Sequence, residues 1–414
     1  MSMSSAKPQV SHPVRVVIAG GGTAGHVYPG LAVAGALVKR GYEPRAIHFV
    51  GSSRGVEKDL VPKAGFELSV LAGRGIQRQM SLQNAKSVWG LAKAVPQAIG
   101  LLRRLEPGVV LGVGGYASVP CVLAAKRLGI PLVIAEQNAV AGLANRLAGR
   151  WSQAAAVAFP DTGLPKAVRT GNPVRDEIQA VDPHAHRMRA RTALGVDPER
   201  LLVVVVSGSL GAARINSATF EAVRAWRDRA DLSVYHVVGK RDWHQLAALR
   251  RAAQAVTQAE AQASAQASAQ AHTQADKSGL GLQYLATEYC EQMADVYAAA
   301  DLIVGRAGAS SLAELTAVGV ASLLVPLAGA PGDHQMANAT YLAAQGAAVL
   351  TLDEELDANK LIVEVERLLS NPTGLEAMAK RAKSLGCLDA DERVADLLEK
   401  HASGPMPLPS GTQG

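Results

Sequence analysis

The chain has 414 residues, enough for two domains of ordinary size, and 48% of them are apolar, which excludes a globally disordered protein. Its 42 basic and 36 acidic residues give a net charge of +6, a modest excess that indicates only weak affinity for anionic surfaces, and we expect no nucleic-acid partner. Three widely spaced cysteines form no C-x-x-C pair, so neither a disulfide framework nor a zinc site is predicted.

The N-terminal stretch MSMSSAKPQVSHP has no apolar segment of the kind that a secretory signal needs. Nowhere does the sequence approach the roughly 18 consecutive apolar residues that indicate a membrane span. We therefore expect a cytosolic protein, which can still lie against a membrane surface.

Short β-branched runs alternate with longer helical patterns along the whole chain, which is typical of βαβ units and parallel sheets. The first series of expected strands is 14–19, 46–50, 68–72, 109–113, 132–136 and 155–159, and the second is 201–209, 233–239, 283–286, 301–305, 321–326 and 347–351. Each series opens with a strong strand that runs into a glycine-containing turn and a helix. The pattern predicts two doubly wound α/β domains, joined near residues 169–177.

Residues 254–278 differ from the rest because they are almost all Ala, Gln, Ser and Thr. Ala and Gln favour helix, but no apolar stripe is present that would dock one. We interpret this segment as a frayed helix or disordered insertion without chemistry, and the tail after residue 400 as disordered.

The first glycine turn, GGGTAGHVYPG at residues 20–30, has the G-x-G-x-x-G spacing of a dinucleotide-binding loop. Such a site needs a carboxylate about twenty residues later, and residues 44–55 contain neither Asp nor Glu. Arg54 leaves an NADP site open as one alternative. A glycine turn that only lets helix and sheet pack is another.

His26 favours a ligand site over both alternatives. It stands at the predicted start of the helix, with Pro29 suited to the first helical turn. Ligands of open α/β sheets bind outside the carboxyl ends of the strands, where this ring would lie.

Five segments together resemble the MurG family of peptidoglycan N-acetylglucosaminyltransferases. They are GGGTAGHVYPGLAVA, GVGGYASVPCVLAAKRLGIPLVIAEQNAVAGLANR, GNPVR, RAGASSLAELTAVG and DHQMANA. They agree with the family in order and spacing, and the match covers roughly residues 14–400 apart from the Ala/Gln-rich insertion.

The resemblance implies a GT-B fold, in which two Rossmann-like domains face a cleft and the last helix crosses back to the first domain. The first domain would be 13–173 with a helix at about 388–401 and would bind acceptor and membrane; the second, 174–387, would bind the UDP-sugar. The implied reaction is inverting transfer of N-acetylglucosamine from UDP-N-acetylglucosamine to the 4-hydroxyl of undecaprenyl-pyrophosphoryl-muramoyl-pentapeptide (lipid I to lipid II), with no cofactor and no metal. The implied location is peripheral, at the cytoplasmic face of the bacterial membrane, and further partners among cell-wall synthesis and division proteins stay open.

For the donor, the resemblance implies that the helix start after 301–305 receives the diphosphate, because free N–H groups and the helix dipole favour anions there. Glu314 would accept the ribose 2′,3′-diol, with a capping-box role as the alternative. Cys290 would read uracil through its backbone, and Arg175 would neutralise the pyrophosphate unless it only forms an interdomain ion pair. The full donor set is Thr23, Ala24, Gly25, His26, Asn138, Arg175, Ser209, Cys290, Ser310, Ser311, Glu314, His334, Gln335 and Asn338.

For the acceptor and the chemistry, the resemblance points to the first domain. The acceptor set is Gly115, Tyr116, Ser118 and Gln137, and the catalytic set is His26, Glu136 and Asn138. An inverting transfer needs a base for the attacking hydroxyl, and a neutral imidazole suits that task near neutral pH. The alternative is that His26 only caps the helix or orients substrate.

The stretch from Arg74 to Arg104 predicts contact with an anionic membrane. It holds six basic residues and no acidic one, with Met80, Leu82 and Trp89 between them. The alternative is a solvated basic face on a helix whose apolar side, with Ile99 and Leu102, faces the core.

Three rival functions share parts of this pattern. A UDP-N-acetylglucosamine 2-epimerase has the same fold and donor. An NADP oxidoreductase would use the first glycine turn for its nucleotide. A silent UDP-sugar-binding subunit would bind donor without turnover.

Overall fold

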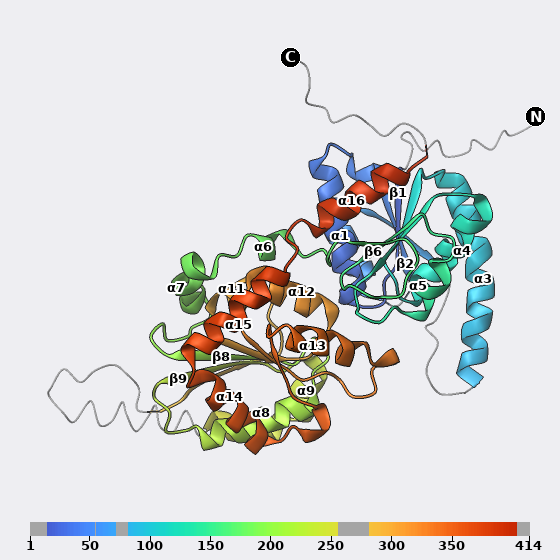
Figure 1. Ribbon diagram of the computed structural model, residues 1–414. Helices are drawn as coiled ribbons and strands as arrows, with labels where there is room; N and C mark the ends of the chain where they lie inside the picture. The colour runs from blue at the N-terminus through green and yellow to red at the C-terminus, as the bar shows by residue number, and fades with distance from the viewer. Residues whose placement is uncertain (1–14, 54, 72–81, 256–280, 404–414) are drawn as a thin grey trace, which may run out of the picture. The chain divides into compact units, whose positions relative to one another are not determined.

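The structure is a computed structural model that describes residues 15–53, 55–71, 82–255 and 281–403 (Figure 1). The chain forms two compact units, one of Met1–Arg175 with Cys387–Gly414 and one of Asp176–Gly386. All of the Ala/Gln-rich insertion (254–278) except its first two residues lies outside the described residues, as do residues 74–81 of the basic stretch.

The first unit is built on a seven-stranded sheet with the order β3-β2-β1-β4-β5-β6-β7, and every described pairing is parallel. Its strands are β1 (Val16–Ala19), β2 (Ile47–Ser52), β3 (Glu67–Leu71), β4 (Val109–Gly112), β5 (Leu132–Glu136), β6 (Ala154–Val157) and β7 (Ala167–Arg169). The sequence predicts all of these except β7, whose three residues are exposed and show no apolar run.

Helices cover both faces of this sheet (Figure 1). They are α1 (Ala24–Lys39), α2 (Glu57–Lys63), α3 (Leu82–Leu105), α4 (Val119–Leu128), α5 (Leu143–Ala148) and α16 (Ala390–His401), with short 3-10 turns at Pro44–Ala46 and Tyr116–Ser118. Because β1 and β4 are buried on both faces, their residues are continuously apolar instead of alternating.

The last helix, α16, belongs to the first unit, as predicted. It lies along α1 and contacts β4, β5 and β6 (Figure 1). Its apolar face enters the core of that unit through Val394, Ala395, Leu397 and Leu398. Arg40 at the end of α1 forms ion pairs with three carboxylates of this helix, those of Glu392, Asp396 and Glu399.

The second unit repeats the plan with a six-stranded parallel sheet in the order β10-β9-β8-β11-β12-β13. Its strands are β8 (Leu201–Val206), β9 (Leu232–Val237), β10 (Gln283–Thr287), β11 (Leu302–Gly305), β12 (Ser322–Leu324) and β13 (Val349–Leu350). Its helices are α6 (Asp176–Gln179), α7 (Pro183–Ala193), α8 (Ala213–Ala225), α9 (Lys240–Gln245), α11 (Met293–Ala299), α12 (Ala309–Val318), α13 (His334–Ala344), α14 (Ala358–Leu369) and α15 (Pro372–Leu385), with 3-10 turns at Pro331–Asp333 and Asp353–Glu355.

The strand order of each sheet reverses at its first strand, so β1 lies between β2 and β4, and β8 lies between β9 and β11. Open parallel sheets bind ligands outside the carboxyl ends of the strands at such a switch point. The loops that begin there follow β1 and β4 in the first unit, and β8 and β11 in the second. These loops and the helices that follow them contain eleven of the nineteen residues that the sequence selects.

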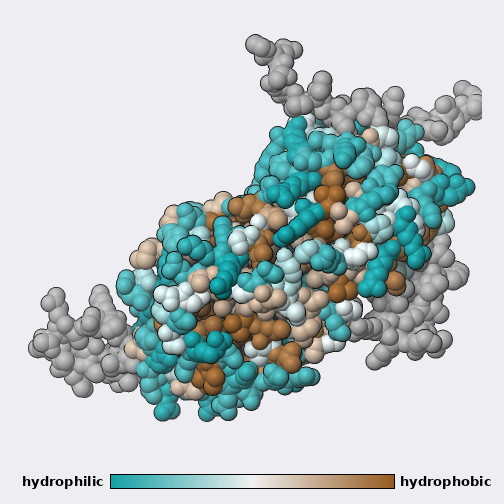
Figure 2. All heavy atoms as spheres, in the orientation of Figure 1, coloured by the Kyte–Doolittle hydropathy of each residue, from teal (hydrophilic) through white to brown (hydrophobic). Residues whose placement is uncertain are grey.

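The surface in Figure 2 is hydrophilic over most of the face shown, with hydrophobic residues in small separate areas on both units. Many of the apolar residues lie instead in the cores of the two units. Across the described ranges, no helix is both long and apolar enough to cross a membrane.

Candidate active site

The loop after β1 places His26 in the first turn of α1. Thr23 is the N-cap residue, which rules out His26 as the cap, and its hydroxyl lies 3.1 Å from Nδ1 of His26. Thr23, Ala24 and Gly25 form the start of the helix, as expected. Pro29 is an exception: it falls in the second turn and not the first, because α1 already begins at Ala24.

A carboxylate that the sequence analysis missed holds this glycine loop. Glu57, on α2, is only 1% exposed, and its oxygens accept from the backbone N–H of Gly22 (2.8 Å), the N–H of Ser52 (2.7 Å) and the hydroxyl of Ser52 (2.8 Å). Any β-carbon on Gly21 would lie 2.4 Å from this carboxylate, so a glycine is required there. Glu57 thus fixes the loop that leads to His26.

The imidazole of His26 lies against the backbone of the loop after β4. A β-carbon on Gly114 would be 3.3 Å from the ring, and one on Gly115 would be 3.4 Å from it; both glycines have positive φ. The hydroxyl of buried Ser118 donates to the carbonyl of Gly115 (2.9 Å), and the amide of buried Gln137 donates to that of Val113 (3.0 Å). Ser118 and Gln137 therefore hold this loop in place through its backbone carbonyls.

Tyr116 follows Gly115 and is half-buried, and burial raises the pKa of its phenol, which keeps the hydroxyl protonated. Within the predicted acceptor set, Gly115 and Tyr116 are partly exposed, whereas Ser118 and Gln137 are buried.

Glu136 ends β5 as a buried carboxylate, and both of its oxygens accept hydrogen bonds from the following loop. One accepts from the backbone and side-chain nitrogens of Asn138 (3.0 and 3.2 Å), and the other accepts from Gly142 N–H and the Asn145 amide (both 2.9 Å). This arrangement suits a residue that positions Asn138 better than one that moves protons.

Arg175, the last residue of the first unit, stacks on an aromatic ring of α1. Its guanidinium carbon lies 4.8 Å from the centroid of the Tyr28 ring, a cation–π geometry. Tyr28 follows His26 by two residues, so the structure brings Arg175 to the same helix start that carries the histidine.

In the second unit, the loop after β8 exposes Ser209 and Leu210 above the carboxyl end of the sheet. The backbone carbonyls of both residues accept from N–H groups at the start of α9, Lys240 for Ser209 (3.1 Å) and Arg241 for Leu210 (3.2 Å). These two hydrogen bonds attach one side of the loop to α9, and its other side faces solvent.

The loop after β11 leads directly into α12, whose N-cap is Gly308. Ser310 and Ser311 consequently occupy its first turn, where free N–H groups favour anions. Glu314 does not form a capping box, because Ser311 is inside the helix. Its carboxylate instead accepts from the hydroxyl of buried Tyr297 on α11 at 2.8 Å.

Cys290 is buried, and burial raises the pKa of its thiol, so the side chain is unsuited to act as a nucleophile. The expected role of its backbone is compatible with this placement. Tyr289 beside it is half exposed and can lie against a base.

The start of α13 carries His334, Gln335 and Asn338, and the structure separates their roles. Asn338 is fully buried, and its amide donates to the carbonyl of Ala307 before α12 (3.2 Å), which suits a brace for that loop. The amide oxygen of Gln335 accepts from Leu327 N–H (2.9 Å). His334 and Gln335 are both half-buried, so they remain accessible to a ligand.

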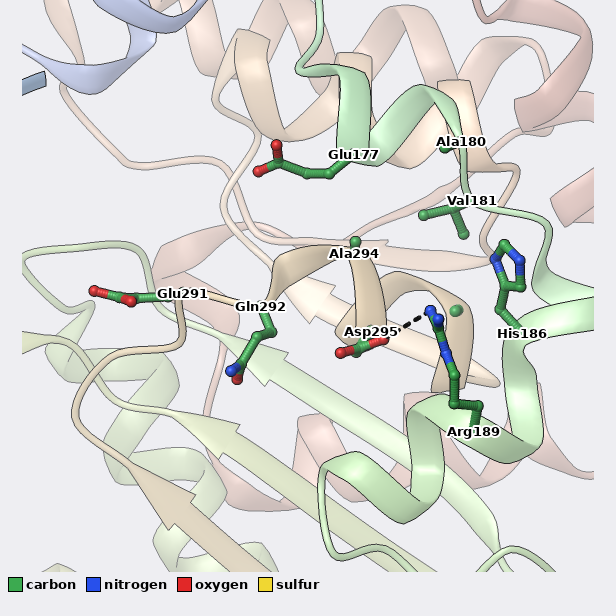
Figure 3. A pocket seen from close by; sticks show the side chains of 10 residues that line it. Glu177, Ala180, Val181, His186, Arg189, Glu291, Gln292, Ala294 and Asp295 are labelled. Carbon is green, nitrogen blue, oxygen red and sulfur yellow. Dashed lines mark ion pairs between the residues drawn. The ribbon is translucent and has the colours of Figure 1, made fainter. Parts of the chain in front are cut away.

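A cavity of about 490 Å³ lies between α6, α7 and the start of α11 (Figure 3). Its wall carries the carboxylates of Glu177, Glu291 and Asp295 and the basic groups of His186 and Arg189, of which Arg189 and Asp295 approach to 3.6 Å. Three carboxylates would repel a diphosphate, so we do not assign the phosphate end of a nucleotide to this cavity.

The parts of the chain that the structure describes contain no group of three or more His, Cys, Asp or Glu side chains placed to hold a metal ion.

Two family models match the chain. The model described as the glycosyltransferase family 28 N-terminal domain matches residues 16–157, and the family 28 C-terminal domain matches residues 202–394. A protein of Desulforudis audaxviator named UDP-N-acetylglucosamine–N-acetylmuramyl-(pentapeptide) pyrophosphoryl-undecaprenol N-acetylglucosamine transferase is 36% identical, over 94% of this chain and 99% of the relative. A Nocardioides protein of the same name is 37% identical, over 93% and 97%.

Solved structures agree with these matches. The crystal structure of Acinetobacter baumannii MurG has a TM-score of 0.69 at 29% identity, covering 94% of this chain and all of that one. A UDP-GlcNAc 2-epimerase from Neisseria meningitidis bound to UDP-GlcNAc has a TM-score of 0.61 at 15% identity, covering 93% of this chain and all of that one, a likeness of fold alone.

Proposed function

The chain belongs to glycosyltransferase family 28 and, within it, to the MurG family, and from this we propose that it transfers N-acetylglucosamine from UDP-N-acetylglucosamine to the 4-hydroxyl of undecaprenyl-pyrophosphoryl-muramoyl-pentapeptide. It is a GT-B glycosyltransferase of peptidoglycan synthesis. The observation that carries the proposal is the identity of 36% over 94% of the chain with a transferase of that name.

The direct test is incubation of the full chain with radiolabelled UDP-N-acetylglucosamine and a lipid I analogue, followed by product analysis. We expect a labelled β-linked disaccharide product and release of UDP. Conversion of the donor to its 2-epimer without acceptor would instead identify an epimerase, and binding without turnover a silent subunit. An NADP-dependent absorbance change would identify an oxidoreductase.

His26 is our proposed base for the attacking hydroxyl. For its Nε2 to accept that proton, Nδ1 must carry the ring proton and donate it to the Thr23 hydroxyl 3.1 Å away. The Thr23 hydroxyl can accept this hydrogen bond, so the contact is compatible with the tautomer that leaves Nε2 basic. Glu136 acts as the positioning residue for Asn138 through the hydrogen bonds described above.

For the donor, we propose that the departing diphosphate is stabilised by backbone amides and not by a metal. The first turn of α12, with Ser310 and Ser311, and the loop of Ser209 each present N–H groups at the switch point of the second sheet. Glu314 takes the ribose diol, the backbone of Cys290 takes uracil, and His334 and Gln335 take sugar hydroxyls. Arg175 supplies a positive charge.

Tyr297 should orient Glu314 for the ribose, because its hydroxyl donates to that carboxylate at 2.8 Å. We expect Tyr297→Phe to raise KM for UDP-N-acetylglucosamine by about 3- to 10-fold, which corresponds to one lost hydrogen bond, with a smaller change in kcat. Steady-state kinetics with varied donor measure this. Tyr42→Phe, which removes a buried phenol hydroxyl from the first unit, is the control and should leave donor KM unchanged.

Peripheral membrane binding through the first unit is also part of the proposal. Within the described part of the basic stretch, Lys93, Arg103 and Arg104 are exposed, while Ile99 and Leu102 pack into the core. A second surface supports the proposal: α5 exposes Leu143 (83%) and Leu147 (40%) on its outer side. The exposed Arg146 and Arg150 flank these leucines.

Sedimentation with vesicles tests this surface. We expect binding to anionic vesicles that weakens as salt rises, and weaker binding after Leu143→Ser with Leu147→Ser. Met188→Ser, at an exposed apolar residue of the second unit, is the control and should bind like the parent. Equal binding to neutral and anionic vesicles, or none at low salt, would contradict the proposal.

A further inference from the structure

A buried polar network lies beneath the loop that follows β8. Its members are Ser207 at the end of that strand, Asn216 on α8, His236 on β9, Asp242 on α9 and Tyr284 on β10, all of them buried. The chemistry proposed above uses none of these side chains. Buried polar groups are costly unless every donor and acceptor is satisfied, so the network calls for a reason.

The partners in this network determine which atom donates and which accepts in each hydrogen bond. The Asn216 amide nitrogen donates to the Val238 carbonyl (3.0 Å) and to Asp242 Oδ2 (2.9 Å). Its oxygen therefore accepts, from the Ser207 hydroxyl (2.5 Å) and from Nε2 of His236 (2.8 Å). This leaves Nδ1 of His236 to accept from the Tyr284 hydroxyl (3.1 Å), and burial lowers the pKa of the ring to about 3, so it stays neutral.

Asp242 connects this network to the loop. Gly211, at φ +100°, packs against the Asp242 side chain, since a β-carbon on Gly211 would be 2.6 Å from the Asp242 carboxyl carbon. The carboxylate also accepts from Nε of Arg241 (2.8 Å), and Nη2 of Arg241 donates to the Gly211 carbonyl (3.2 Å). Movement of Asp242 would therefore move the loop.

The attachment fixes which way the loop amides point. The carbonyl of Ser209 faces α9, where it accepts from the N–H of Lys240. In a trans peptide the C=O and the next N–H point in opposite directions. The N–H of Leu210 consequently faces away from α9, toward the outer side of the loop.

We propose that Asp242, which lies against Gly211, and His236, which acts on Asp242 through Asn216, are positioning residues for the donor. They hold residues 208–211 so that the Leu210 N–H faces the diphosphate of the UDP-sugar. The inference rests on the proposed function. It adds the requirement that the network affects recognition of the diphosphate and not of the nucleoside.

Competition by UDP and by uridine in the full-length enzyme separates the two parts of the donor. Asp242→Asn cannot accept from both Asn216 and Arg241, and we expect it to raise the Ki of UDP by about tenfold while the Ki of uridine stays unchanged. His236→Leu should have the same effect. His236→Gln, whose amide nitrogen takes the place of Nε2, should restore most of the UDP affinity.

The control is Ser233→Ala, at the opposite end of β9, which removes a buried hydrogen bond to Gln283 (2.8 Å) and should lower the Tm without changing the ratio of the two Ki values. If Asp242→Asn fails to fold, the two His236 variants decide the question. A ratio that stays at the parent value, or a uridine Ki that rises equally, overturns the inference. Absence of transfer by the parent enzyme would instead overturn the proposed function.

Discussion

Replacement of His26 by alanine should lower kcat by about 10²- to 10⁴-fold, the usual range for loss of a general base, while the affinity for UDP stays intact. The reason is that Nε2 of His26 takes the proton of the acceptor hydroxyl in an inverting transfer. The parent kcat/KM should also fall toward acid pH, because protonation of the imidazole removes the base, and the alanine variant should lack this acid limb. Steady-state kinetics across a pH series measure both effects.

Two further variants separate the base from its surroundings. Thr23→Val removes the hydroxyl that contacts Nδ1 of His26 and should lower kcat by about 2- to 12-fold, the range for one hydrogen bond. His184→Ala removes an exposed histidine from the second unit and should behave like the parent. If His26→Ala keeps more than roughly a third of kcat, or the same acid limb, another group is the base.

Replacement of Glu314 by alanine should reduce kcat/KM for UDP-N-acetylglucosamine by about 30- to 1,000-fold, because charged hydrogen bonds to two ribose hydroxyls contribute roughly 2–4 kcal/mol together. The protein should stay folded, because Glu314 is half-buried and loss of its hydrogen bond with Tyr297 costs about 1–3 kcal/mol, a fraction of the usual stability of a domain. Donor-dependent kinetics and a thermal melt measure the two effects.

A 2′-deoxy donor makes the Glu314 test specific. The parent enzyme should penalise this donor strongly, and Glu314→Ala should penalise it much less, because the partner of the missing hydroxyl is already gone. Glu291→Ala, which removes an exposed carboxylate from the same unit, should stay within about twofold of the parent. Equal penalties in parent and Glu314→Ala would show that Glu314 does not bind the ribose.

The sequence predicts the strands and the loops at the two switch points because these features depend on short local sequence patterns. Runs such as Val16–Ala19 and Leu201–Val206 are continuously apolar and end in glycine turns, and helix starts follow at once. His26 and Ser310 could therefore be placed at helix starts without any structure. The short strand β7 lacks such a signal, since its residues are exposed.

The residues that support the site depend on contacts that no local pattern encodes. Glu57 meets Gly22 across 35 residues, and Asn216 meets Asp242 across 26. The sequence also cannot say whether a carboxamide points outward or inward. The sequence predicts that Gln137 and Asn338 bind substrate, whereas in the structure each side chain is buried and donates to a backbone carbonyl.

The crossing of α16 onto the first unit has a consequence for synthesis of the protein on the ribosome. Arg40 and its partner Glu392 are 352 residues apart, so at about 5–20 residues per second they are made roughly 20–70 s apart. During that interval the nascent first domain lacks the apolar side chains that α16 contributes to its core. The first domain therefore begins synthesis first but is completed last. The second unit, Asp176–Gly386, is fully synthesised before α16 and can fold before the first domain is complete.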